Sequence, residues 1–127
     1  MDFYPAKTGL AEERRYRVGL TGTGAAIPTV RAGVGFTMSR TGAGVYRITF
    51  NDNPGTFVGV EAPFLRADAP AAVKNMSVTA GAYVAPAAGA DGYIELSVWS
   101  SGGIATDLAA AQYIDTTVIF AAQSRIK

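Results

Sequence analysis

The run Asn51-Asp52-Asn53 places three oxygen-bearing side chains in a row, a grouping that could hold a calcium ion. Calcium prefers about six to eight oxygen ligands, several of them carboxylates, and Asp52 is the one carboxylate in this run. Pro54 and Gly55 follow directly, and asparagine and aspartate side chains bond their own main chain in turns. We therefore interpret the run as a turn and predict no metal site.

The residues needed for common enzyme chemistry are scarce. The sequence has no histidine and no cysteine, which removes the commonest general base, thiolate nucleophiles and zinc–thiolate sites. The serines lie in no Gly-x-Ser-x-Gly context, and a serine–lysine dyad would have to use Lys7, Lys74 or Lys127. Glycoside hydrolysis needs two carboxylates close in space, and no acidic pair stands out. We predict that the protein is not an enzyme and uses no cofactor.

The glycine-rich run GLTGTGA, residues 19–25, invites comparison with a phosphate-binding loop. Such a loop ends in Gly-Lys-Ser/Thr and leads into a helix, whereas Pro28 follows here at once. We therefore predict no phosphate-binding site in this run.

The densest basic run is EERRYR, residues 12–17. In a strand, Arg15 and Arg17 would share one face, while Arg14 and Tyr16 would lie on the other. The net charge is only +1, and two glutamates adjoin the arginines, so a nucleic-acid footprint is disfavoured. We predict that Arg14, Arg15 and Arg17 form a solvated edge or a surface that binds protein.

Residues 1–11 are predicted to form an N-terminal arm, and residues 12–127 a single domain. Phe3 and Tyr4 are adjacent aromatic residues on this arm, and they either pack on their own domain or dock on a neighbouring subunit. No apolar run approaches the ~20 residues that span a bilayer, and the start lacks the pattern of a signal peptide. We expect a soluble protein made in the cytoplasm, without a membrane partner.

Alternation of apolar and polar residues predicts strands that bury one face. In residues 34–40 the apolar positions are Val34, Phe36 and Met38, and in residues 45–50 they are Tyr46, Ile48 and Phe50. Residues 41–44 are a glycine-containing turn, so these two segments are expected to pair as a hairpin, with Phe36 and Met38 facing Ile48 and Tyr46.

Further strands are expected at the start of residues 14–24 and in residues 56–62, 73–80, 93–101 and 115–123. Residues 62–72 are interpreted as a long connection, and residues 107–114 as one short helical turn capped by Asp107. The chain is therefore predicted to be all-β: an antiparallel, jelly-roll-like β-sandwich of about seven or eight strands, or else a small barrel.

Tyr93 and Trp99 share one face of the strand at residues 93–101, opposite Ile94, Leu96 and Val98. The aromatic pair either fills the inner face of the sandwich or binds a sugar or another subunit. Apolar residues on both faces would fit an oligomer better than an isolated domain.

Three segments resemble small virion proteins of tailed bacteriophages: RVGLTGTGAAIPT, GVGFTMSRTGAGVYRITFNDNPGTFV and TDLAAAQYIDTTVIFAA. The resemblance covers roughly residues 14–122 and is a pattern of β-rich segments. Similar phage proteins open with an arm and a strand, continue with a TRTGxGVYxxTF-like hairpin and close on a DLAxxxY turn.

The resemblance implies a structural component of the particle, in the first place a capsid decoration (cement) protein. Such a protein binds the exterior of the virion capsid, often as a homotrimer, and bridges subunits of the major capsid protein. The resemblance carries no site residues, so Phe3, Tyr4, Arg14, Arg15 and Arg17 are our own candidates for contacts with the shell or a sister subunit. The alternatives are a tail or neck component and a carbohydrate-binding module that uses Trp99 and Tyr93.

Overall fold

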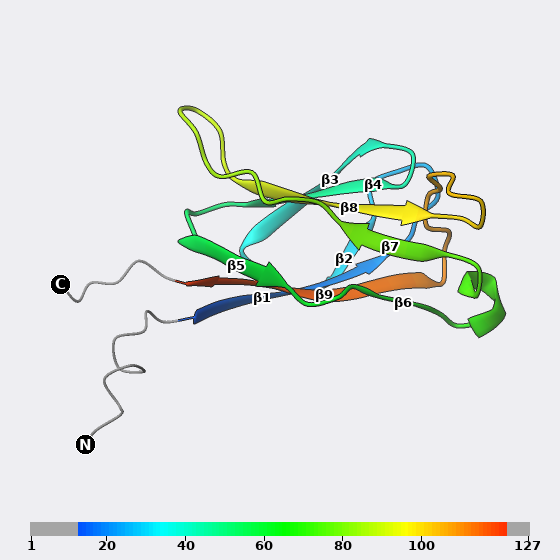
Figure 1. Ribbon diagram of the computed structural model, residues 1–127. Coiled ribbons are helices and arrows are strands. Elements are labelled where there is room, and N and C mark those ends of the chain that lie inside the picture. The colour runs from blue at the N-terminus through cyan, green and yellow to red at the C-terminus, as the bar shows by residue number, and fades with distance from the viewer. Residues whose placement is uncertain (1–12, 122–127) are drawn as a thin grey trace, which may run out of the picture.

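The computed structural model describes residues 13–121 and has two antiparallel sheets packed face to face (Figure 1). The predicted all-β sandwich is thereby confirmed. The described part of the chain contains nine strands and one 3-10 turn: β1 (Glu13–Thr21), β2 (Thr29–Ala32), β3 (Phe36–Gly42), β4 (Val45–Phe50), β5 (Thr56–Val60), β6 (Phe64–Ala67), η1 (Pro70–Val73), β7 (Ser77–Ala80), β8 (Tyr93–Trp99) and β9 (Gln112–Ala121).

Sheet A has the strand order β2-β1-β9-β5, and β6 also pairs with β9. Sheet B has the order β3-β4-β8-β7. Strand β9 is central to sheet A because β1 pairs with it from Glu13 to Thr21, while β5 and β6 share its other side. The first and last described strands therefore lie side by side, with Glu13 opposite Ala121.

The core lies between the two sheets, where alternate residues of each long strand point inward. In β8 these are Ile94, Leu96 and Val98, all fully buried, as the alternation predicted. Phe120 is fully buried on β9 and packs edge-on against Phe50 of the other sheet, with ring centroids 5.1 Å apart. The complete set of buried apolar residues is Val18, Leu20, Phe36, Tyr46, Ile48, Phe50, Ile94, Leu96, Val98, Leu108, Ile114, Val118 and Phe120.

Tyr83 supplies the first stability prediction. Its ring stacks on Phe57 at 5.4 Å, yet its buried hydroxyl has no hydrogen-bond partner within residues 13–121. Burial raises the pKa of this hydroxyl, so the group stays protonated, and no hydrogen bond from the described residues replaces those it made with water in the unfolded chain. Tyr83→Phe should therefore raise the free energy of unfolding by about 1 kcal/mol in urea titrations. Tyr46→Phe is the control and should lower it, because the Tyr46 hydroxyl accepts the Leu108 N–H at 2.7 Å; a loss of stability in Tyr83→Phe would contradict the argument.

The predicted hairpin is confirmed as β3 and β4, with Met38 opposite Ile48. Two details of the prediction are wrong. Tyr46 lies opposite Arg40 instead of an apolar residue, and Val34 precedes β3 and is 85% exposed. Val34 is outside the strand because Gly33 and Gly35 both have positive φ, which turns the chain from β2 toward β3.

The predicted helical turn at residues 107–114 is wrong. Asp107 precedes no helix, and its carboxylate instead accepts hydrogen bonds from Arg40 and from the Gly44 N–H. β9 already begins at Gln112, after Ala111 takes a positive φ of 64°. The single 3-10 turn of residues 13–121 is η1, which lies in the region interpreted as a connection.

Two short strands, β2 and β6, were not predicted. Each has four residues, TVRA and FLRA, so neither contains enough alternation to be recognised alone. They form because longer strands offer them edges: β2 pairs with the end of β1, and β6 with the start of β9.

Candidate functional site

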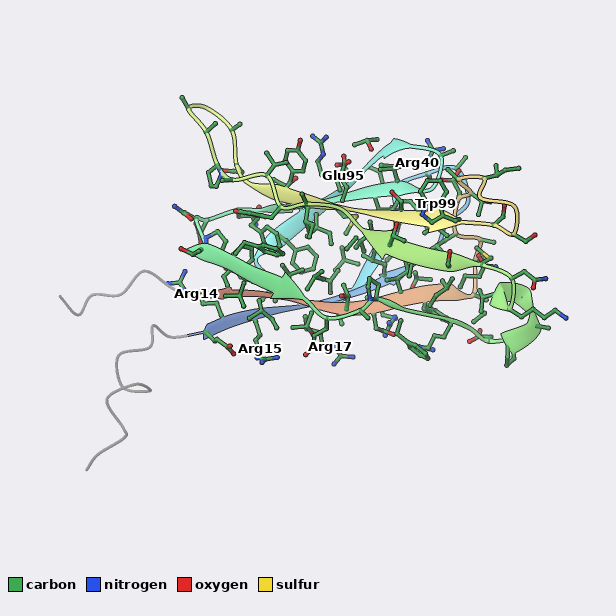
Figure 2. The ribbon with its side chains drawn as sticks, viewed as in Figure 1. Arg14, Arg15, Arg17, Arg40, Glu95 and Trp99 are labelled. Carbon is green, nitrogen blue, oxygen red and sulfur yellow. The ribbon has the colours of Figure 1, made fainter. Side chains whose placement is uncertain are left out.

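Arg15 and Arg17 project from the outer face of sheet A, away from sheet B, whereas Arg14 points elsewhere (Figure 2). This arrangement follows from β1, because Val18 and Leu20 point into the core on the face that Arg14 and Tyr16 share. All three arginines are exposed. The structure therefore brings two of the predicted contact residues onto one surface and places Arg14 at the edge of the opposite face.

Two further arginines, which the sequence did not single out, extend this surface. Arg31 of β2 and Arg66 of β6 flank Tyr113 of β9, with their guanidinium carbons 5.4 and 4.5 Å from the ring centroid. Asp115 accepts a hydrogen bond from each of them, and the Arg66 Nε bond is 3.1 Å long. We call Arg15, Arg17, Arg31, Arg66 and Tyr113 the arginine surface. No local pattern marks Arg31 or Arg66, because each belongs to one of the short strands.

Four members of the arginine surface, Arg15, Arg31, Arg66 and Tyr113, are held in place by side-chain hydrogen bonds. The Tyr113 hydroxyl donates to Asp68 at 3.0 Å, and this bond, followed by burial, raises the pKa of the hydroxyl. Arg15 forms ion pairs of 3.2 Å with Glu13 and with Glu61, although both partners are half-exposed and such pairs contribute little to stability. Charges of both signs therefore alternate on this surface, a pattern that suits a protein partner better than a polyanion.

Arg14 and Arg17 differ from the other arginines of sheet A. Neither forms an ion pair with a carboxylate within residues 13–121. Both belong to the half of β1 that pairs, among the strands the structure describes, with β9 alone.

The outer face of sheet B carries a second polar cluster. Arg47 lies 3.8 Å from the centroid of the Tyr93 ring and donates to Glu95 through Nε at 3.0 Å. The Trp99 indole N–H donates to the Thr79 hydroxyl at 2.9 Å, which ties the ring to the neighbouring strand β7 (Figure 2).

Tyr93 and Trp99 thus lie on the outer face, and of the two alternatives for this pair the first, that they fill the inner face, is wrong. Leu96 and its neighbours of β8 take the inner positions, since they alternate with the aromatic pair. The residues that share the outer face are rich in hydroxyls: Thr37, Ser39, Thr41, Thr49, Ser77, Thr79 and Ser97.

The Asn51-Asp52-Asn53 run is exposed and lies between β4 and β5. The Asn53 Oδ1 accepts the Gly55 N–H at 3.1 Å, which is the side-chain-to-main-chain bond of an Asx turn. Across residues 13–121, no three acidic side chains gather into a group that could ligate a metal ion. The same part of the chain has no helix long and apolar enough to cross a membrane.

Phe3 and Tyr4, the two arm residues predicted to contact a partner, lie outside the described residues. No family model, curated protein or solved structure matches this chain.

Proposed function

We propose that this chain is a structural protein of a tailed-phage particle, in the first place a decoration protein on the capsid exterior. It binds the shell and bridges neighbouring copies of the major capsid protein. The observation that carries the proposal is the arginine surface, because arginine and tyrosine are enriched among the residues that dominate protein–protein binding. The phage-like segments named above supply the kind of partner.

The construction of the surface also supports this role. Strands β1, β2, β6 and β9 of one sheet contribute its side chains, and bonds to Asp68 and Asp115 hold Tyr113, Arg31 and Arg66 in place in the free chain. A preordered surface loses less side-chain entropy on binding. In a homotrimer, three such surfaces would act together, so modest individual contacts would give firm attachment. Phe3 and Tyr4 of the arm remain our candidates for an additional contact.

The test is binding to shells assembled from the major capsid protein of the same genome. We expect the chain to sediment with these shells in a fixed ratio, and Arg17→Glu to weaken binding about tenfold through lost charge pairing. Lys74→Glu is the control. Lys74 is exposed and follows η1, so this substitution makes the same reversal of charge at a position away from Arg17. Binding to isolated tails in a few copies, without binding to shells, would contradict decoration and favour a tail or neck component.

A carbohydrate-binding module is the second candidate. It is favoured by the outward placement of Trp99, whose indole is held by Thr79 among the hydroxyl side chains of sheet B. A flat aromatic ring beside polar groups suits the apolar face of a sugar. The sedimentation experiment separates the candidates when insoluble polysaccharide is included, because such a module would sediment with the polysaccharide and leave the shells bare.

A further inference from the structure

Strand β1 has an open edge over its first half. It pairs with β9 along its full length but with β2 only at Gly19, Leu20 and Thr21. Within residues 13–121, no strand or isolated bridge pairs with Glu13–Arg17 on the side away from β9. This half of β1 has no second neighbour among the described strands because the chain leaves sheet A at Gly33, whose φ is 108°, and crosses to β3.

The main-chain groups at this edge can be assigned from the register. The Gly22 N–H donates to the Gln112 carbonyl at 2.9 Å, and the β1–β9 pairing continues in the same register to Glu13. Because antiparallel strands alternate, the N–H and C=O groups of every second residue point away from the partner. Glu13, Arg15 and Arg17 therefore direct their main-chain groups toward the open edge.

Gly33 sets the end of this edge. A Cβ at Gly33 would come within 1.9 Å of the Arg17 carbonyl oxygen, so the main chain of the β2–β3 connection closes over that carbonyl. Val34 follows directly and is 85% exposed. The open edge is thus about 17 Å long, at about 3.4 Å per residue, and has an apolar side chain beside its closed end.

The charges around the open edge are basic on both faces of the sheet. Arg17 lies on the outer face and Arg14 on the inner side, and neither pairs with a carboxylate of the described residues, whereas Arg15 is bound to Glu13 and Glu61. Charged side chains on an edge discourage pairing with unmatched strands. A strand that does pair must bring carboxylates to Arg17 and Arg14, which lie three positions apart.

We propose that the open edge of β1 binds an extended acidic segment of a partner protein, which joins sheet A as an added strand. Main-chain hydrogen bonds to Glu13, Arg15 and Arg17 hold the segment, and two acidic residues three positions apart select it. This inference rests on the proposed function only for the identity of the partner, which would be the shell protein. It adds the mode of docking and the chemistry of the docked segment.

A second copy of the same chain fits this edge less well. The open groups belong to Glu13, Arg15 and Arg17, so two β1 strands related by a twofold axis would meet with Arg15 opposite Arg15 and Glu13 opposite Arg17. Like charges directly opposite each other destabilise a strand pair, which offsets part of the gain from the two Glu13–Arg17 pairs. This pairing also brings no carboxylate to Arg14, whereas an acidic segment can supply one to both Arg14 and Arg17.

The test uses the full chain and a fluorescein-labelled peptide of threonine and valine that carries two carboxylates three positions apart. Binding is measured by fluorescence anisotropy, with the peptide's asparagine and glutamine analogue beside it. The decisive variants are Arg15→Pro and Arg15→Ala. Both variants remove the Arg15 side chain and its exposed ion pairs, but only proline also removes the main-chain N–H that points to the open edge. A strand tolerates proline at such a position, because the missing N–H makes no hydrogen bond within the sheet.

We expect Arg15→Ala to bind the acidic peptide within about threefold of the wild type, because exposed ion pairs contribute little. Arg15→Pro should bind at least about tenfold more weakly. The double variant Arg14→Gln, Arg17→Gln should also bind the acidic peptide about tenfold more weakly than the wild type does. The wild type should bind the amide analogue about tenfold more weakly than it binds the acidic peptide. Bound peptide should slow amide hydrogen exchange at Glu13 and Arg15, whose N–H groups point to the open edge.

Equal binding by Arg15→Pro and Arg15→Ala would overturn the proposal, as would equal affinity for the acidic peptide and its amide analogue. The proposal would also be overturned if the free chain forms a dimer that Arg15→Pro dissociates and Arg15→Ala does not. That result would assign the open edge to a second copy of the chain. Peptide binding by a chain that ignores assembled shells would instead remove the proposed function and leave this inference standing.

Discussion

Phe120→Ala should lower the free energy of unfolding by about 4 kcal/mol. The Phe120 ring is fully buried and packs edge-on against Tyr16, Phe50 and Tyr83, with centroid distances of 5.7, 5.1 and 5.1 Å. Truncation would leave a cavity between the sheets, because rings from both layers surround the site and the main chain of β9 is held on both sides.

Urea or thermal unfolding of the purified chain measures this effect. Phe64→Ala is the matched control: it removes the same ring from β6 of the same sheet, where the side chain is 60% exposed, and should change stability by less than about 1 kcal/mol. Similar losses in both variants would mean that the core does not lie where the sandwich places it.

Asp107→Asn should lower the free energy of unfolding by about 2 kcal/mol. The Asp107 carboxylate accepts three hydrogen bonds: from Arg40 Nε at 3.0 Å, from Arg40 Nη2 at 2.9 Å and from the Gly44 N–H at 2.7 Å. The next residue, Leu108, is fully buried and donates its N–H to the Tyr46 hydroxyl at 2.7 Å. These contacts fasten the loop before β9 to the β3–β4 hairpin, and an asparagine would lose the charge and one acceptor.

The same carboxylate makes stability depend on pH. The hydrogen bond from Arg40, opposed by burial and assisted by the Gly44 N–H, holds the pKa of Asp107 below its ordinary value of 3.8. A lowered folded-state pKa stabilises the protein fully above the unfolded pKa, and that stability is lost as pH falls from there through the folded pKa. The wild type should therefore lose its advantage over Asp107→Asn as pH falls below about 4.

Thermal unfolding of the two chains across this acid range gives the comparison. Asp91→Asn is the control, since Asp91 is exposed and forms no ion pair with the described residues, and it should follow the wild type at every pH. A constant difference between the wild type and Asp107→Asn from neutral pH down to pH values near 3 would show that the charge of Asp107 is not the cause.

The pairing of β3 with β4 shows what local sequence can predict. Alternating apolar residues on both sides of a glycine turn place Phe36, Met38, Ile48 and Phe50 on one face, as the structure has them. The observed register differs from the predicted one by two residues, because a shift of two positions keeps every side chain on its face and local alternation does not exclude it. Strand β8 was predictable for the same reason, because Ile94, Leu96 and Val98 alternate without a break.

Asp107 shows where the same reasoning fails. An aspartate before three alanines favours a helical turn by its local preferences. The carboxylate instead bonds to Arg40, which is 67 residues away in the sequence, and Leu108 enters the core. Burial and a bidentate ion pair together outweigh the few tenths of a kcal/mol per residue that local helix preference supplies.

The sequence by itself determined the strand-forming segments other than β2 and β6, the inward face of the long strands and the scarcity of catalytic groups, because all of these depend on residue types and near neighbours. It also placed Arg15 and Arg17 on one face of a strand. Only the tertiary structure decided that Arg31 and Arg66 join them around Tyr113, and that Tyr93 and Trp99 face outward. It alone also left the first half of β1 without a second neighbour among residues 13–121. These features depend on which strands become neighbours, and that choice is made by burial across both sheets, between residues far apart in the chain.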